Sequence, residues 1–401
     1  MGTKSDRAIA LTAKCITQDG EHAIVEISFT IKNDAPLRIL RRCVDFDVSA
    51  DAENYFCGLT PEGGETVFSG IPEKQGSRVR LLDADVSVGE TYAYFAVSGD
   101  GEGVFVGPAP VRVRDPYIYY SHARILEKEK QLAERFGGSL TTLGETVGHK
   151  PLVALSVGNP DRTVALLGAV HAGEAGAELC LGVIERIVAS RPDLLSKTGL
   201  VTLPSVNADE RERMVTGNPW YLRTNRNGID INRNFDAKWE TVGYSYGVST
   251  DDPTSSTYRG PYPSSEPETR AVVSLLSRFS PIAAISYHDM YSITGDSMYL
   301  PRSAEGDAAF AERAERIARP YKEGFREPIG YPMNKVLFYA GSAGGFPEYC
   351  YRNGTVGFDV EHWASGLTNL EGRAGDKTTR ALLDECISLH TSALVRLLEQ
   401  L

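Results

Sequence analysis

The sequence lacks the features that define several large classes of protein. No apolar run approaches the roughly 20 residues that span a bilayer, which argues against a transmembrane protein. Six cysteines in 401 residues, none of them in a C-x-x-C pair, are too few for a disulfide scaffold. A formal charge of −11 provides no basic footprint for nucleic acid or for an anionic membrane. These absences leave a globular chain with room for two domains.

The N-terminal stretch also lacks a recognisable targeting signal. MGTKSDRAIALTAK has no uninterrupted apolar core of the kind found in secretory signals. We therefore expect either a cytoplasmic protein or the mature form of an exported one. The sequence sets no oligomeric state.

Residues 9–114 consist of short alternating apolar runs between turn signals. HAIVEISFTI, TYAYFAV and VFVGPAPVRVR are separated by Gly, Asp and Pro, which predicts an antiparallel β-sandwich. The segment from VSVGETYAYFAV to PVRV resembles the last two strands of a fibronectin type III or immunoglobulin-like module, with Tyr92 placed for a tyrosine corner. Because Pro116 disfavours helix before it and the periodicity then changes, we predict domains at 1–115 and 116–401.

After this boundary, strand-like apolar runs alternate with amphipathic helical patterns. This alternation predicts an α/β domain with a mixed, mainly parallel sheet flanked by helices, behind the N-terminal all-β sandwich domain. The predicted strands are 151–157, 163–170, 199–207, 281–288 and 355–363, and the helical patterns include 121–136, 175–189, 268–279 and 307–318.

His171 and Glu174 follow the strand-like run 163–170. A turn that begins at the histidine can bring both side chains to one point, and Zn²⁺ accepts both imidazole nitrogen and carboxylate oxygen. Taken alone, the pair is more typical of a helix N-terminus whose Glu174 complements the dipole. However, His288 and Glu361 end two other predicted strands, and ligands gather at the carboxyl ends of strands in open α/β sheets.

The segment WYLRTNRNGIDINRNF, residues 220–235, concentrates arginine and asparagine around Asp230. A solvated basic loop is the ordinary interpretation of such charges. Guanidinium groups, however, offer a planar pair of donors to a carboxylate, and asparagine adds a neutral donor. The segment therefore also suits recognition of a carboxylate.

With these motifs in order, the chain from about Tyr117 to its end resembles the M14-type zinc metallocarboxypeptidases. The resemblance implies a zinc carboxypeptidase-like fold and one Zn²⁺ per chain, bound by His171, Glu174 and His288. The matching landmarks are HAGE (171–174), PSVNAD (204–209), LRTNR with GIDINRNF (222–235), YRGPYPSSEPET (258–269), the strand-terminal His288, AGG (343–345) and DVE (359–361).

The same resemblance implies roles for the groups around the metal ligands. Asp230 orients the ring of His171. Glu361 is the general base that takes a proton from the attacking water, with Asp359 as a rival on the same strand face. Arg223 stabilises the developing oxyanion, with Arg226 as its competitor.

Asn232 and Arg233 match the clamp for the terminal carboxylate of the substrate. Tyr339 is the candidate capping tyrosine, although it precedes Gly344-Gly345 by four intervening residues where the family has three. The usual specificity position falls near Pro347, with the acidic Glu348 beside it. A neutral or a basic substrate side chain is compatible with this pair.

Together, these observations predict a zinc-dependent metallopeptidase that removes C-terminal amino acids from peptides with a free terminal carboxylate. The alternatives are a peptidoglycan-type peptidase on the same scaffold, a deacylase of the aspartoacylase kind, or a non-catalytic binding protein. The larger domain and the arginine-rich segment favour the peptidase over the deacylase. Retention of Glu361 argues against a binding protein, because binding needs no general base.

Overall fold

The chain forms two compact units. The first comprises Met1–Tyr119, Arg213–Tyr221 and Asn369–Thr378, and the second comprises Tyr120–Glu212, Leu222–Thr368 and Thr379–Leu401. No helix among the described residues is long and apolar enough to cross a membrane. The computed structural model describes residues 8–18, 22–31, 34–44, 58–98, 104–217, 222–241, 249–288, 297–326, 335–339, 342–361 and 380–401.

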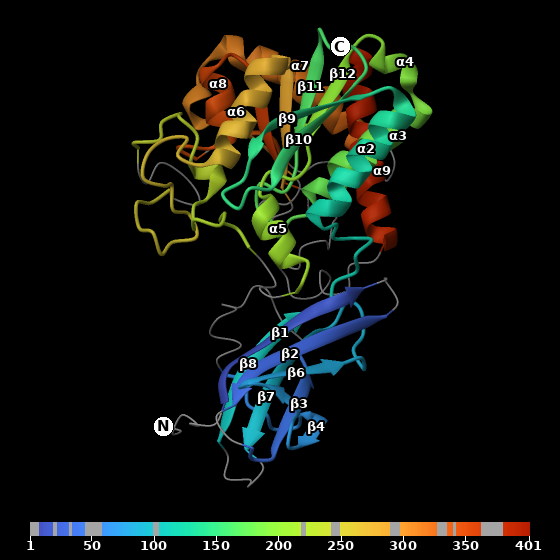
Figure 1. Ribbon diagram of the computed structural model, residues 1–401. Coiled ribbons are helices and arrows are strands. Elements are labelled where there is room, and N and C mark those ends of the chain that lie inside the picture. The colour runs from blue at the N-terminus through green and yellow to red at the C-terminus, as the bar shows by residue number, and fades with distance from the viewer. Residues whose placement is uncertain are drawn as a thin grey trace. The chain divides into compact units, whose positions relative to one another are not determined.

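The first unit contains two antiparallel sheets (Figure 1). Their strand orders are β1-β2-β6-β5 and β4-β3-β7-β8. The core lies between them, where Val25 and Ile27 of one sheet join Ile39 and Tyr94 of the other, all 0% exposed. The predicted all-β N-terminal region is confirmed. The strands are β1 (Ala8–Gln18), β2 (Ala23–Ile31), β3 (Leu37–Cys43), β4 (Glu65–Gly70), β5 (Lys74–Gln75), β6 (Arg78–Asp83), β7 (Thr91–Ser98) and β8 (Phe105–Arg112).

Two local features of this unit depend on particular residues. The Tyr92 hydroxyl accepts a hydrogen bond from the backbone N–H of Ser87 at 2.9 Å, the bond expected of a tyrosine corner. A later segment joins the same unit, because the Arg112 N–H donates to the Gly217 carbonyl at 2.9 Å. A Cβ at position 217 would lie 1.9 Å from the Arg112 carbonyl oxygen, so this close approach requires glycine.

The second unit is built on a mixed sheet with strand order β15-β14-β16-β13-β11-β12-β10-β9. The inner strands β16, β13, β11 and β12 are parallel, whereas β10 and β9 add antiparallel pairings at one side. The predicted mixed, mainly parallel sheet is confirmed. The strands are β9 (Ser139–Glu145), β10 (Pro151–Val157), β11 (Thr163–Leu167), β12 (Gly199–Leu203), β13 (Ala283–His288), β14 (Ser297–Leu300), β15 (Lys335–Tyr339) and β16 (Val356–Glu361).

Helices cover both faces of this sheet, with α6 and α8 on one side and α2, α3 and α9 on the other (Figure 1). Leu275 of α6 and Phe346 of α8 enter a core that also contains Ala165 and Ala284 from the central strands. The helices are α2 (His122–Phe136), α3 (Gly176–Ser190), α4 (Pro192–Leu195), α5 (Ala208–Met214), α6 (Pro267–Phe279), α7 (Ala308–Arg326), α8 (Phe346–Arg352) and α9 (Arg380–Gln400), with short 3-10 turns η1 (Ile231–Arg233) and η2 (Arg302–Ala304).

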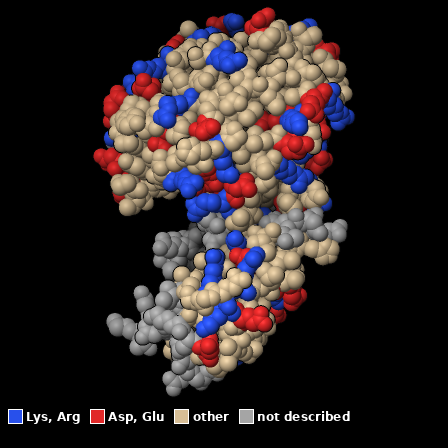
Figure 2. Space-filling model, in the orientation of Figure 1, with Lys and Arg blue, Asp and Glu red and all other residues tan. Residues whose placement is uncertain are grey.

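Basic and acidic side chains are interspersed on the face of the second unit that Figure 2 shows. Tan, uncharged surface separates these charges.

Candidate metal centre and active site

A tight turn after β11 carries the first two candidate metal ligands. β11 ends at Leu167, earlier than the predicted 163–170, and the chain turns at Gly168. A Cβ on Gly168 would lie 2.4 Å from the backbone of Gly176, so the turn folds back on the start of α3 too closely for any side chain. The Glu174 N–H donates to the His171 carbonyl at 3.1 Å, and this bond sets the two side chains on one side of the turn.

Arg211 of α5 donates hydrogen bonds to the backbone of this turn. Its side chain is 0% exposed, and its Nη1 donates to the carbonyls of Ala172 at 3.0 Å and Glu174 at 2.8 Å. Its Nη2 pairs with the buried Glu178 of α3. A buried guanidinium with these partners fixes the backbone that presents His171 and Glu174.

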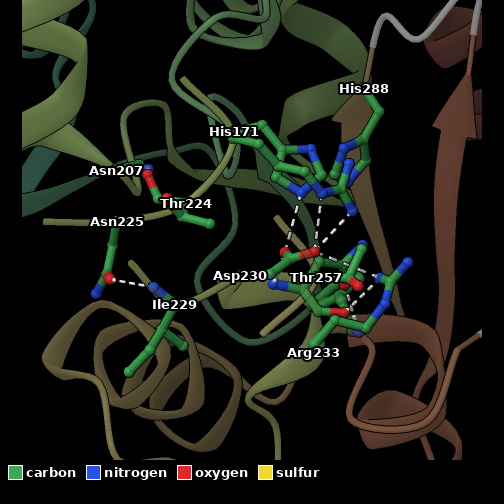
Figure 3. A network of polar contacts seen from close by, with 12 residues as sticks. His171, Asn207, Thr224, Asn225, Ile229, Asp230, Arg233, Thr257 and His288 are labelled. Atoms are coloured by element: carbon green, nitrogen blue, oxygen red, sulfur yellow. Dashed lines mark hydrogen bonds and ion pairs between the residues drawn. The ribbon is translucent and has the colours of Figure 1, made fainter. Parts of the chain in front are cut away.

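His171, Glu174 and His288 form one buried group in which the ligand atoms all lie within 4.8 Å of one another. Nδ1 of His171 lies 2.8 Å from Oε1 of Glu174, and Nδ1 of His288 lies 3.0 Å from Oε2 of Glu174. The two rings lie side by side with centroids 4.9 Å apart (Figure 3). His288 comes from the end of β13, so the group joins two neighbouring parallel strands.

The donor set of this group suits a zinc ion. Two imidazole nitrogens and one carboxylate are the three protein ligands of many catalytic zinc sites. Burial raises the pKa of Glu174, but His171 and His288 outweigh that effect and hold the pKa below its ordinary value. Oε2 of Glu174 is buried, and its contact with Nδ1 of His288 at 3.0 Å lacks good hydrogen-bond geometry. The residues present therefore fit Zn²⁺.

Asp230 lies behind His171, at the ring nitrogen that faces away from Glu174. Nε2 of His171 is 3.2 Å from Oδ1 of Asp230 (Figure 3), as expected for a carboxylate that orients a metal-binding imidazole. Oδ2 of Asp230 accepts hydrogen bonds from Nε of Arg223 at 2.9 Å and from Nη2 at 2.7 Å. Burial raises the pKa of Asp230, but Arg223 and Arg233 outweigh it and hold the pKa well below the ordinary range.

Arg223 and Arg226 lie in different surroundings. The Arg223 side chain is 15% exposed and points toward Asp230 beside the histidines. Arg226 is exposed, and its Nη1 lies near Gly148 in another part of the unit. This placement favours Arg223 over Arg226 as the cation beside the reacting group.

Asn232 and Arg233, the candidate clamp, lie on η1 and are each 6% exposed. Nδ2 of Asn232 donates to Oδ2 of Asp359 at 2.9 Å, and Oδ1 of Asn232 accepts the Phe346 N–H at 2.8 Å. Nη1 of Arg233 donates to the Asn232 carbonyl at 2.8 Å and lies 4.0 Å from Oδ2 of Asp230. The candidate clamp residues therefore lie next to Asp230.

Glu361 and Asp359 both lie on β16, next to β13. Glu361 pairs with His288 across the strands, and Asp359 pairs with Ser286, so all four side chains project from the same face of the sheet. Glu361 is partly exposed, whereas Asp359 is buried and lies between His288 and Asn232. Of the two rivals for the base, Glu361 is the carboxylate with solvent access.

The remaining candidates concern substrate recognition. Tyr339 is the last residue of β15, and its side chain lies outside the part of the chain that the structure describes. Glu348 is 1% exposed and accepts hydrogen bonds from the backbone and hydroxyl of Ser303. Its charge is therefore directed at Ser303, which weakens the interpretation of Glu348 as a determinant for basic side chains.

A second set of buried carboxylates supports the arginine-rich loop and was not predicted. Nδ2 of Asn225 donates to Oε2 of Glu266 at 2.7 Å and to Oε2 of Glu268 at 3.0 Å. Oδ1 of Asn225 accepts the Ile229 N–H at 3.1 Å (Figure 3), which closes the loop before Asp230. The sequence contains no signal for this burial, because glutamates at the start of a helix are ordinarily exposed.

The fold and the buried His-Glu-His group define an α/β protein with a candidate metal site among the polar side chains at the carboxyl ends of its strands. Residues 126–367, more than half of the chain, match the model of the Peptidase_M14 zinc carboxypeptidase family. The chain belongs to this family, as its sequence motifs predict.

Two curated relatives and one solved structure give the range of the similarity. Mast cell carboxypeptidase A of Rattus norvegicus is 29% identical over 189 residues, 41% of this chain and 42% of that protein. Murein peptide amidase A of Escherichia coli K12 is 32% identical over 114 residues, 27% of this chain and 42% of that protein. The aligned part thus spans less than half of each curated relative. The crystal structure of a metallo-carboxypeptidase from Burkholderia cenocepacia matches the fold with a TM-score of 0.54 and 15% identity, over 100% of this chain and 98% of that one.

Proposed function

We propose that the protein is a zinc-dependent metallocarboxypeptidase that hydrolyses C-terminal amino acids from peptides. The observation that carries this proposal is the buried group of His171, Glu174 and His288, with ligand atoms within 4.8 Å, beside the Asn232-Arg233 pair. His171, Glu174 and His288 would hold one Zn²⁺, which when bound polarises a carbonyl and makes water a better nucleophile near neutral pH.

The chain's own residues supply the remaining chemistry. Glu361, partly exposed at the end of β16, takes a proton from the attacking water and passes it to the leaving amine. Arg223 stabilises the negative charge that develops on the carbonyl oxygen, a role that suits a fixed cation in a mostly buried position. Asp230 fixes the positions of His171 and Arg223 relative to each other, because it contacts both side chains.

Asn232 and Arg233 bind the terminal carboxylate of the substrate. The guanidinium and the amide are both nearly buried, so their hydrogen bonds to a carboxylate form where little water competes. This pair limits cleavage to the last residue of a peptide. A substrate without a terminal charge would leave the buried Arg233 without that partner.

A matched pair of substrates tests the proposal. We expect a blocked dipeptide with a free carboxylate to be cleaved with a kcat/KM about 10- to 100-fold above that of its C-terminal amide, the effect of one charged hydrogen-bonded contact. Arg233→Met should lower the rate for the acid toward that for the amide. Equal cleavage of both substrates by the native protein would refute the carboxylate clamp.

A murein peptidase is the second candidate, supported by the 32% identity to the E. coli murein peptide amidase over 114 residues. Adding a murein-derived peptide to the same assay separates the two candidates. Faster cleavage of that peptide than of any free-acid dipeptide would favour the murein substrate. No turnover of either class with zinc bound would favour a binding protein.

A further inference from the structure

The two histidines of the metal group have matching surroundings. In each ring, Nδ1 faces Glu174, at 2.8 Å for His171 and 3.0 Å for His288. In each ring, Nε2 faces a different carboxylate: Asp230 Oδ1 at 3.2 Å for His171 and Asp359 Oδ1 at 3.5 Å for His288. The site thus contains two carboxylate-histidine pairs on opposite sides of Glu174.

A metal-binding imidazole needs a hydrogen-bond acceptor at the ring nitrogen that does not bind the metal. When Nδ1 binds the metal, Nε2 carries the ring proton and needs an acceptor that fixes the tautomer and the ring orientation. Oδ1 of Asp359 is buried and makes no hydrogen bond among the described residues. It is therefore available to the His288 proton, which Ser286 Oγ also approaches, at 3.0 Å.

The second carboxylate oxygen of Asp359, Oδ2, contacts Asn232 of the proposed substrate clamp. Oδ2 accepts a hydrogen bond from Nδ2 of Asn232 at 2.9 Å, while the Asn232 backbone N–H donates to Oδ1 of Asp230 at 3.0 Å. Asn232 is therefore held between the two carboxylates that face the histidines. A change at Asp359 alters both the support of His288 and the orientation of the Asn232 amide.

We propose that Asp359 is a positioning residue that orients His288 for the metal through Oδ1 and fixes Asn232 for the substrate carboxylate through Oδ2. The inference rests on the proposed function, in which His288 binds zinc and Asn232 binds the terminal carboxylate. Asp359 thereby acts for His288 as Asp230 acts for His171. It joins the metal site and the clamp through one side chain.

Asp359→Asn tests the first half of this inference. An amide has one acceptor oxygen, so it cannot accept from both His288 Nε2–H and Asn232 Nδ2–H, and one donor must face an NH₂ group. We expect the zinc dissociation constant, measured without substrate by competition with a chromogenic chelator, to rise about 10- to 100-fold. Unchanged zinc affinity would overturn the role of Asp359 at His288.

Three matched variants make the result specific. Glu361→Gln makes the same carboxylate-to-amide change two residues along β16 and should leave zinc affinity unchanged. Asp230→Asn should weaken zinc binding on the same scale as Asp359→Asn, because it removes the equivalent partner of His171. Ser286→Ala tests the rival acceptor: weaker zinc binding in this variant, together with unchanged binding in Asp359→Asn, would assign His288 to Ser286 instead.

Folding is checked separately from metal binding. The thermal unfolding of each metal-free variant is compared with that of the native protein. Where Asp359→Asn does not fold, Asp359→Ala removes both acceptors without introducing an NH₂ group, and its zinc affinity should fall at least as far. Native zinc affinity in folded Asp359→Ala would also overturn the proposal.

The clamp half has its own measurement. In Asp359→Asn, KM for a free-acid dipeptide should rise several-fold relative to KM for its amide, because only the acid uses Asn232. An unchanged ratio would overturn the link to Asn232. Failure of the proposed function has a different signature, since native protein would then bind zinc yet cleave neither substrate.

Discussion

Each unit contains one buried cluster of charged side chains, and the two clusters differ in what their side chains can bind. In the first unit, Asp83 accepts from Arg41 at 3.2 Å, from the Tyr94 hydroxyl at 2.8 Å and from the Asp85 N–H at 3.0 Å. In the second unit, Glu174 faces two imidazole nitrogens, Nδ1 of His171 at 2.8 Å and Nδ1 of His288 at 3.0 Å. Both clusters are buried, but the cation of the first is a guanidinium, which cannot bind a metal, whereas the second contains imidazoles, whose nitrogens can.

The comparison shows that burial alone does not identify a functional site. The Arg41-Asp83-Tyr94 cluster is complete without a ligand, because each charge has an opposite partner at hydrogen-bond distance. In the second cluster, two imidazoles and a carboxylate present ligand atoms within 4.8 Å of one another, a donor set that suits a cation such as Zn²⁺. The electrostatic effects differ in direction: burial and Asp83 raise the pKa of Tyr94 above its ordinary value, whereas burial raises the pKa of Glu174 but the two histidines outweigh it and lower the pKa.

Replacing a metal ligand should give the largest effect. His288→Ala removes one of the three ligands, so we expect zinc content to fall from about one per chain to near zero and hydrolysis to become undetectable. Elemental analysis and a dipeptide assay measure both. Full zinc content with native turnover would show that this cluster is structural.

Glu361→Gln should come next. The variant keeps the size of the side chain but removes the base, so turnover should fall by roughly 10² or more while zinc stays bound. Steady-state kinetics with metal analysis of the same sample separate the two effects. Native turnover would move the base to another residue, and Asp359 is the first to test.

Asp83→Ala should affect stability and leave catalysis unchanged. The substitution removes the buried acceptor of Arg41 and of the Tyr94 hydroxyl, while Arg41 keeps Glu65 and Asp85 as partners. It should lower the free energy of unfolding of the first unit by about 2 kcal/mol. Chemical denaturation measures the loss, and turnover per folded molecule is the control. Lower turnover per folded molecule would show that the Asp83 cluster also contributes to catalysis, contrary to this comparison.

Tyr92→Phe should give the smallest change. It removes one hydroxyl and its hydrogen bond to Ser87, so we expect a loss of about 1 kcal/mol in the same denaturation experiment. Zinc content and turnover should match those of the native protein. A loss above about 3 kcal/mol would mean that Tyr92 contributes more than one hydrogen bond.

The sequence predicts those parts of the site that follow strand ends. His171, His288 and Glu361 each follow or end an apolar run, and parallel strands bring such ends to one edge of a sheet. Strands with weak apolar patterns were not predicted, among them β9 (Ser139–Glu145), in which only two of seven residues are large and apolar. The predicted helix 307–318 continues through Pro320 to Arg326, because Tyr321 and Phe325 bury their rings beyond the proline.

Partners brought in by tertiary structure were the least predictable. Arg211 lies in the charged helix ADERERM, where the sequence indicates a solvated side chain, yet it is 0% exposed and binds the carbonyls of the metal-site turn. Asp359 was identified as a rival base, but its contacts with Asn232 and His288 depend on the pairing of β16 with β13. Neither contact can be inferred from the spacing of the residues along the chain.

The central claim is that hydrolysis depends on a metal held by His171, Glu174 and His288. The most direct measurement is hydrolysis of a blocked free-acid dipeptide by one preparation before chelation, after chelation and after readdition of zinc, with metal content determined at each step. The account predicts about one zinc per chain at the start, loss of hydrolysis with the metal, and recovery with its return. Full hydrolysis by metal-free protein would contradict it.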